Sequence, residues 1–200
     1  MIPRHLVISA AVMFAVALGM SFYVWHMRSR AKETQPAAAA DGRPVAAPVS
    51  GPTEQVTLYV ANDQTGELRA RSARIPLPAG RQAHAEELLR ALFSLYLEKN
   101  SPHPLGPGSE VRNIYLVDPG LAVIDLNQAF ADGHRSGILV EELTVASLAE
   151  TLSANLPGIT RVKFLVEGKE RDTLAGHADL SEFYDVSAVN QMVAQLQIGQ

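Results

Sequence analysis

The stretch VRNIYLVDPGLAVIDLNQAF, residues 111–130, contains two apolar runs separated by a turn signal. VRNIYLV and LAVIDL both have the length and composition of strands, and Asp118-Pro119-Gly120 lies between them. Because proline fixes φ and glycine accepts a positive φ, these residues suit a tight turn. The stretch therefore predicts a pair of strands joined by a turn, and the rest of the domain is arranged around it.

Asp125 is the unusual residue of this stretch, because it lies between Ile124 and Leu126 near the end of an apolar strand. A carboxylate in such a place is either a catalytic group or a structural group that bonds backbone N–H groups where the chain leaves the sheet. Asn127 follows closely, and the sequence places no acid or histidine beside Asp125. We therefore predict that Asp125 is structural.

Hydrophobic patterns on both sides of residues 111–130 predict an α+β domain over residues 54–186, a single compact domain of β-hairpins packed against two or three helices. Alternation indicates strands, and i, i+3, i+4 spacing indicates helices. The expected elements are strands at 54–61 and 67–76, a helix at 82–97, the two strands at 111–126, a helix at 138–156, a strand at 161–168, and a C-terminal amphipathic helix and tail at 187–200, with Ser187 as its cap.

The chain before residue 54 has a different composition. The segment from Leu6 to Trp25 is uncharged, and a helix of that length at about 1.5 Å per residue spans about 30 Å, the thickness of a bilayer core. No small-residue cleavage site follows it directly. We predict a single-pass transmembrane anchor with its flanks at residues 1–30, followed by a disordered Pro/Ala-rich linker at residues 31–53.

The orientation of this anchor is left open by the charges. Arg28, Arg30 and Lys32 outnumber Arg4, which favours a cytoplasmic C-terminal flank, whereas an N-terminal signal anchor commonly exports the domain that follows it.

Composition excludes several classes of function. The chain has no cysteine, so disulfides, thiolate chemistry and a lipidated cysteine are all absent. Residues 1–53 hold five of the 17 basic and two of the 21 acidic side chains, which leaves 12 basic and 19 acidic side chains in residues 54–200. A domain this acidic repels phosphate backbones, so nucleic acid is not an expected partner.

No arrangement of residue types predicts a catalytic, cofactor-binding or metal site. No two histidines lie three or four residues apart, and His103 and His134 are expected to be exposed because they lie in Pro/Gly-rich loops. The full set of histidines is His5, His26, His84, His103, His134 and His177.

Two kinds of charged group have simple explanations. The pairs Glu86-Glu87 and Glu141-Glu142 are expected near helix starts, where carboxylates oppose the helix dipole. The arginines at 69, 71 and 74 predict a strand edge or a solvated strand face, with an anionic polymer as the alternative ligand.

Residues 54–183 resemble the GerMN domain, the module of bacterial GerM sporulation and germination proteins and of the actinobacterial lipoprotein LpqB. The likeness is carried in order by VTLYV, AEELLRALF, PHPLGPGSEVRNIYLVDPGLAVIDLNQAF, ASLAETL and GITRVKFLVEGKE. The resemblance implies an extracytoplasmic, non-enzymatic module of envelope-spanning assemblies, and it favours an exported, periplasmic domain.

Three functions follow from these observations. The first is a membrane-anchored extracytoplasmic module that docks on an envelope protein assembly. The second is a module that binds cell-wall glycan or a small ligand at the loop of residues 100–109, beside Tyr96 and with His103 available. The third and least favoured is an envelope hydrolase that uses Asp125.

Overall fold

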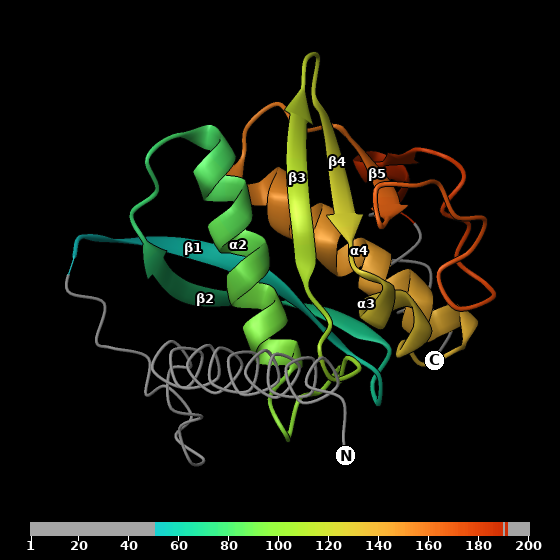
Figure 1. The fold of residues 1–200 in the computed structure, drawn as a ribbon. Helices are drawn as coiled ribbons and strands as arrows, with labels where there is room; N and C mark the ends of the chain where they lie inside the picture. The colour runs from blue at the N-terminus through green and yellow to red at the C-terminus, as the bar shows by residue number, and fades with distance from the viewer. Residues whose placement is uncertain (1–50, 190, 192–200) are drawn as a thin grey trace, which may run out of the picture. The chain divides into compact units, whose positions relative to one another are not determined.

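The computed structural model describes residues 51–189 and 191. The predicted anchor at residues 6–25, nearly all of the predicted linker and residues 192–200 lie outside the described residues. Within the described part, no helix is long and apolar enough to cross a bilayer. The elements are β1 (Thr53–Asn62), β2 (Glu67–Pro76), α2 (Arg81–Tyr96), β3 (Val111–Val117), β4 (Leu121–Leu126), α3 (Gln128–Asp132), α4 (Ile138–Asn155), β5 (Arg161–Val166) and β6 (Tyr184–Asp185) (Figure 1).

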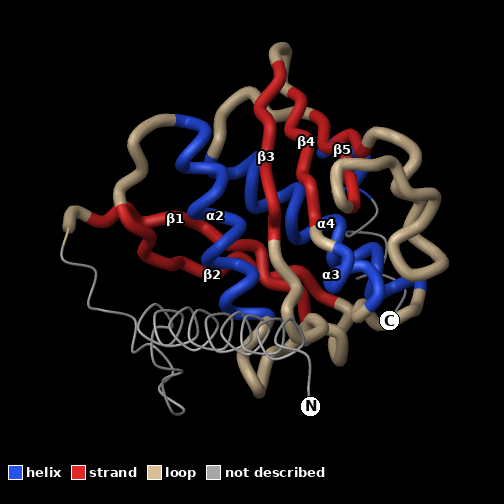
Figure 2. The backbone as a smooth tube through the Cα atoms, viewed as in Figure 1, coloured by secondary structure: helices blue, strands red, loops and turns tan. Residues whose placement is uncertain are grey.

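The strands form two separate sheets (Figure 2). β1 and β2 make an antiparallel two-stranded sheet, and the second sheet has the order β3-β4-β5-β6. The α+β class and the hairpin predicted at residues 111–126 are confirmed. The expectation of hairpins alone is incomplete, because β5 pairs with β4 in parallel. Parallel neighbours require a crossover, which here contains α3 and α4.

Helix α4 is the centre of the core. Every residue from Leu143 to Leu152 is buried, so the helix is covered on all sides and not along one stripe. It passes behind β3 and β4 in the view of Figure 1. The predicted helical spacing correctly identified one face of α4 but missed the opposite, equally buried face.

The free edge of β1 is closed by polar side chains of the two long helices. Ser147, Thr151 and Asn155 are spaced four apart on α4, and they bond the backbone of Tyr59 and Thr57 at 2.6–3.0 Å. The hydroxyl of Tyr96 on α2 accepts from the N–H of Ala61 at 2.8 Å. These side chains thus bond the backbone groups of β1 that would otherwise be unpaired at the edge of the sheet.

Two local features differ from expectation. Helix α3 was not predicted, and Asn127 caps it by accepting from the N–H of Phe130 at 3.0 Å. Helical conformation after β6 begins at Val186, so Ser187 lies inside the helix and is not its cap. Val189 of this helix is buried in the main core.

Candidate functional site

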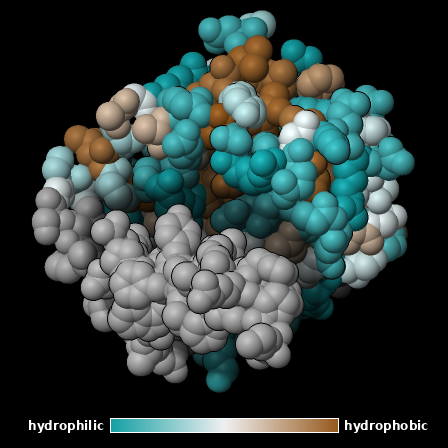
Figure 3. Space-filling view, in the orientation of Figure 1, coloured by the Kyte–Doolittle hydropathy of each residue, from teal (hydrophilic) through white to brown (hydrophobic). Residues whose placement is uncertain are grey.

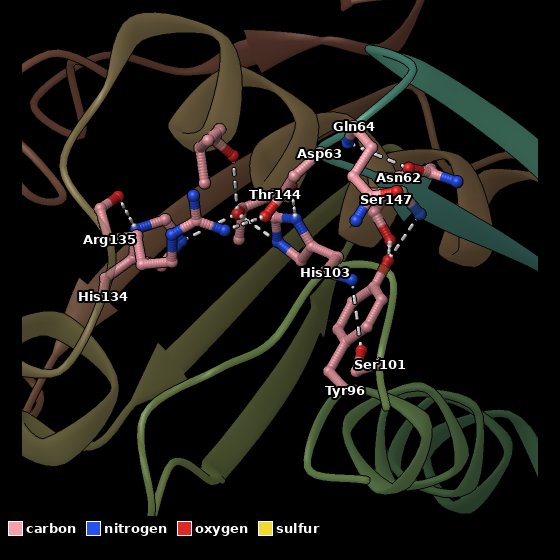
Figure 4. Close-up of polar contacts among 12 residues, drawn as sticks. Asn62, Asp63, Gln64, Tyr96, Ser101, His103, His134, Arg135, Thr144 and Ser147 are labelled. Atoms are coloured by element: carbon pink, nitrogen blue, oxygen red, sulfur yellow. Dashed lines mark hydrogen bonds and ion pairs between the residues drawn. The ribbon is translucent and has the colours of Figure 1, made fainter. Parts of the chain in front are cut away.

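A polar group centred on a buried hydroxyl, which we call the Thr144 cluster, consists of Asp63, His103, Thr144 and His134 (Figure 4). Asp63 Oδ1 lies 2.5 Å from His103 Nδ1, and His103 Nε2 lies 2.7 Å from the Thr144 hydroxyl. His134 Nε2 lies 2.8 Å from the same hydroxyl. The expectation that His103 and His134 are exposed is wrong, because they are only 1% and 8% exposed.

Local structure brings His103 inward. The N–H of Asp63 donates to the carbonyl of Pro102 at 3.0 Å, which joins the end of β1 to the loop of residues 100–109. The His103 ring packs edge-on against Tyr96, with ring centroids 4.8 Å apart. The prolines of this loop indicated exposure, but the bond to Pro102 and the packing against Tyr96 bury His103.

The order Asp63–His103–Thr144 resembles an acid, a base and a hydroxyl nucleophile. Thr144 is only 1% exposed, and its hydroxyl also contacts His134 and the carbonyl of Val140. The apolar space beside it, between α4 and the sheet, has no room for a water molecule. A substrate cannot reach this hydroxyl, so the Thr144 cluster is arranged to hold elements together.

Protonation follows from the acceptors around His134. Its Nδ1 faces the carbonyl of Arg135 at 2.8 Å, so Nδ1 carries the hydrogen when the ring is neutral, and Nε2, 2.8 Å from the Thr144 hydroxyl oxygen, carries none. Burial lowers the pKa of His134, which favours this neutral form. Asp63 is also held by Arg135 at 2.7 Å. Among the residues that the structure describes, no group of three or more His, Asp or Glu side chains is placed so that it could hold a metal ion.

Asp125 is only 2% exposed and joins three parts of the chain. Its Oδ1 accepts from the N–H of Gly168 at 2.7 Å, and its Oδ2 lies 3.1 Å from Arg112. Arg112 also lies 3.3 Å from Glu167. The predicted backbone N–H partner is present, but it comes from the turn after β5 and not from the chain that follows Asp125.

The turn after β5 depends on its backbone conformation. Glu167 and Gly168 have φ angles of 54° and 72°, and glycine adopts such angles without steric strain. The Glu167 side chain accepts from the N–H of Gln128 at 2.8 Å, at the start of α3. Asp125 and Glu167 therefore fix β3, β5 and α3 relative to β4.

The predicted acidic pairs have different surroundings. Glu86 and Glu87 lie beyond the first turn of α2, so the helix-dipole explanation is wrong for them. Glu141 does lie in the first turn of α4, but it is fully buried and its main role is to accept hydrogen bonds from residues 175–178. Burial would raise its pKa, yet these backbone N–H groups lower it to about 2.

The sheet of β3 to β6 has one face on the core and one face without a covering helix. Tyr115, Val117 and Phe183 are each about half exposed on this open face. Strand register places Leu121 and Val123 opposite Val117 and Tyr115, on the same side. We call this surface the apolar sheet face, and apolar side chains gather over the β3–β4 hairpin in Figure 3. Its apolar members are Tyr115, Val117, Leu121, Val123 and Leu165, and on β5 the same face carries Arg161 and Lys163, whose charged groups lie over the ring of Phe183.

The loop of residues 100–109 does not offer the ligand groups expected of it. Tyr96 and His103 are both 1% exposed and bonded to other residues, so neither can contact a ligand. A groove of about 460 Å³ lies nearby between α2 and the start of β3, lined on its two sides by residues such as Arg90 and Glu110.

Residues 57–172 match the sequence profile of the family described as "Germane: Sporulation and spore germination". This chain belongs to the Germane family. The match covers more than half of the chain, and it confirms the resemblance to GerMN domains inferred from the sequence. No functionally curated protein is significantly similar to this Germane chain.

A solved structure shows the same fold. The tandem GerMN domains of the sporulation protein GerM from Bacillus subtilis have a TM-score of 0.51 and 20% identity, with 67% of this chain and 46% of that chain covered. This chain therefore spans less than half the length of the tandem protein. The first GerMN domain alone (TM-score 0.46, 19% identity, 67% and 98% covered) and a candidate lipoprotein from Clostridium perfringens (TM-score 0.46, 18% identity, 72% and 93% covered) are also similar.

The Germane resemblance has a physical basis in two adjacent strands. The motif G-x-A-x-I-D-L forms β4 and the motif V-x-F-L-V-E-G-K forms β5 with its turn. Asp125 of the first motif accepts the N–H of Gly168 in the second. Gly120 of the first motif has a φ of 76°, and a Cβ there would collide with the carbonyl oxygen of Gly158. These two motifs, both within the matched residues 57–172, thus meet in one contact between parallel strands.

Proposed function

We propose that this Germane-family chain is a membrane-anchored module of the bacterial cell envelope that binds another envelope protein and does not act as an enzyme. The uncharged segment from Leu6 to Trp25 supplies the anchor, and the linker of residues 31–53 separates it from the domain. The family's association with sporulation and germination supports an envelope setting.

The apolar sheet face is the observation that carries this proposal. The β3–β4 pair is antiparallel, and antiparallel strands with one solvated face normally have polar side chains on that face. Here Tyr115 and Val117 remain 50% and 46% exposed, next to the half-buried Leu121 and Val123. Phe183, beyond these strands, lies under the cations of Arg161 and Lys163. Contiguous apolar surface of this kind indicates a protein contact. The buried Thr144 cluster and Asp125, by contrast, offer no accessible reactive group.

Photo-crosslinking in cells tests the apolar sheet face. A benzophenone amino acid at Tyr115 or Val117 of the full-length chain is expected to capture the same envelope protein, because both side chains lie on this face. Leu77, which is 56% exposed after β2, provides the matched control position. Equal capture from position 77, or no capture from positions 115 and 117, would contradict the proposed interface.

Reporter fusions test the anchor and its orientation. Alkaline phosphatase fused after Gln200 of the full-length chain is expected to be active in cells and to stay in the membrane fraction after an alkaline wash. A fluorescent protein that folds only in the cytoplasm is expected to be dark at the same position. Fluorescence without phosphatase activity would show that Arg28, Arg30 and Lys32 keep the C-terminal flank of the anchor in the cytoplasm.

A further inference from the structure

The outer edge of β2 has backbone groups that no other described residue bonds. The Thr57, Tyr59 and Ala61 N–H groups point to α4 and α2, as their bonds to helix side chains show. In an antiparallel pair, groups alternate between facing the partner strand and facing away. The N–H and C=O groups of Val56, Leu58 and Val60 in β1 therefore face β2 and bond their register partners there. The partners in β2 are Ala73, Arg71 and Arg69, which leaves the N–H and C=O groups of Leu68, Ala70, Ser72 and Arg74 directed outward.

The other strand edges of the described domain are bonded by side chains, interrupted or short. Side chains of α2 and α4 bond the free edge of β1. At β3, the register shifts between Val111 and Asn113, and the Gln82 side chain donates to the carbonyl of Ile114. β6 is only two residues long. Within the described residues, β2 therefore presents the longest uninterrupted edge, and its one proline is the last residue, Pro76.

The charge of this edge is opposite to that of the rest of the domain. Residues 54–200 are acidic overall, whereas β2 carries arginines at positions 69, 71 and 74, all of them exposed. Arg69 pairs with Glu67. Arg71 and Arg74 make no ion pair with any residue that the structure describes. Arginines on an edge also discourage edge-to-edge association, and two copies of β2 side by side would place like charges together.

We propose that the outer edge of β2 binds an extended acidic segment of another protein, which adds to the sheet as a third strand beside β2. The alternating outward N–H and C=O groups select a polypeptide backbone, and the arginines select acidic side chains. An anionic polymer would satisfy the arginines but not the backbone groups, and a second copy of β2 would satisfy the backbone groups but not the charges. This inference concerns a different surface from the apolar sheet face and does not depend on it.

The probe is a fluorescent peptide of about eight residues, the length of an ordinary strand, that alternates threonine and glutamate. Its control has the same sequence with N-methyl groups on alternate backbone nitrogens, which keep the charge and block pairing. We expect the full-length chain in mild detergent to bind the first peptide, and the N-methylated peptide to bind at least about tenfold more weakly, as loss of two or more hydrogen bonds requires.

Matched protein variants locate the contact. Ser72→Pro removes an outward N–H without removing a bond to β1, so it is expected to weaken peptide binding about tenfold while Ser72→Ala leaves it unchanged. Arg71→Glu is expected to abolish binding, whereas Lys169→Glu, a charge reversal on the exposed turn after β5, is not. Pulse proteolysis in urea checks that each variant is folded.

Three results would overturn the proposal. Equal binding of both peptides would show that the protein recognises only the negative charge of the peptide and not its backbone. Equal binding to the Ser72→Pro and Ser72→Ala variants would place the peptide elsewhere. Absence of binding to the full-length chain, including the case in which its own segment or a second copy already pairs with β2, would show that this edge does not serve an acidic partner.

Discussion

Replacement of Glu141 by glutamine is expected to lower the free energy of unfolding by about 3 kcal/mol or more at neutral pH. The Glu141 carboxylate is fully buried and accepts from the backbone N–H groups of Gly137, Ala175, His177 and Ala178 at 2.9–3.1 Å. An amide has one acceptor oxygen and one nitrogen that carries its own hydrogens. In the variant, that nitrogen would face N–H groups that need an acceptor.

The loss extends beyond the hydrogen bonds themselves. Glu141 holds the segment between β5 and β6 against the start of α4, and the buried side chains of Leu174 and Leu180 lie in this segment. If the segment detaches, these two leucines leave the core. Burial of each leucine contributes about 1.5–3 kcal/mol, so local release would add to the cost of the substitution.

The pH dependence of stability has a defined sign. The folded state lowers the Glu141 pKa from 4.5 to about 2, so this carboxylate stabilises the fold fully above pH 4.5. That contribution, about 3 kcal/mol, is lost as the pH falls from 4.5 towards 2. The Glu141→Gln variant is expected to lack this part of the acid dependence.

Glu142→Gln is the matched control, because it makes the same charge change on the adjacent residue. Burial raises the pKa of Glu142, and its substitution is expected to leave stability unchanged or slightly improved. Pulse proteolysis of the full-length chain in urea suits the measurement, since the single tryptophan, Trp25, lies outside the domain. Equal losses in both variants would mean that the bonds of Glu141 are not responsible.

Local sequence signals predicted the elements of this fold well. The turn residues at 118–120 and the apolar alternation around them identified β3 and β4 with their observed bounds. Helix α4 was predicted within a residue of its end, because Pro157-Gly158 stops a helix. Helix α3 escaped prediction since its five residues are too few to show helical spacing.

The polar contacts could not be predicted, because their partners are distant in the sequence. His103 lies 40 residues from Asp63 and 41 from Thr144, so its Pro/Gly-rich surroundings were the sole local signal, and they indicate exposure. Likewise, Asp125 and Gly168 are 43 residues apart and meet because β4 and β5 are parallel. The sequence indicated an antiparallel hairpin at β4, but no local signal indicates which strand becomes its other neighbour.

Asp125→Ala is expected to lower the free energy of unfolding by about 2–4 kcal/mol, because it leaves the Gly168 N–H without an acceptor and removes the buried partner of Arg112. Asp125→Asn is expected to cost less. Its amide oxygen can still accept from Gly168, and Arg112, which has about a third of its side chain exposed, keeps Glu167 at 3.3 Å. Asn113→Ala is the control, because it removes a polar side chain that lies opposite Asp125 on the same face of the sheet.

The two interpretations of Asp125 give opposite results in one experiment. If the carboxylate is structural, crosslinking from position 115 falls only as far as the folded fraction falls, and Asp125→Asn retains most of both. If it is a reactive group, removal of a buried charge leaves stability unchanged or improved, and both variants lose function. Pulse proteolysis in urea gives the stability, and crosslink yield from the full-length chain gives the function. Two stable variants that have both lost crosslinking would refute the structural role, because the contacts with Gly168 and Arg112 would then contribute nothing to the fold.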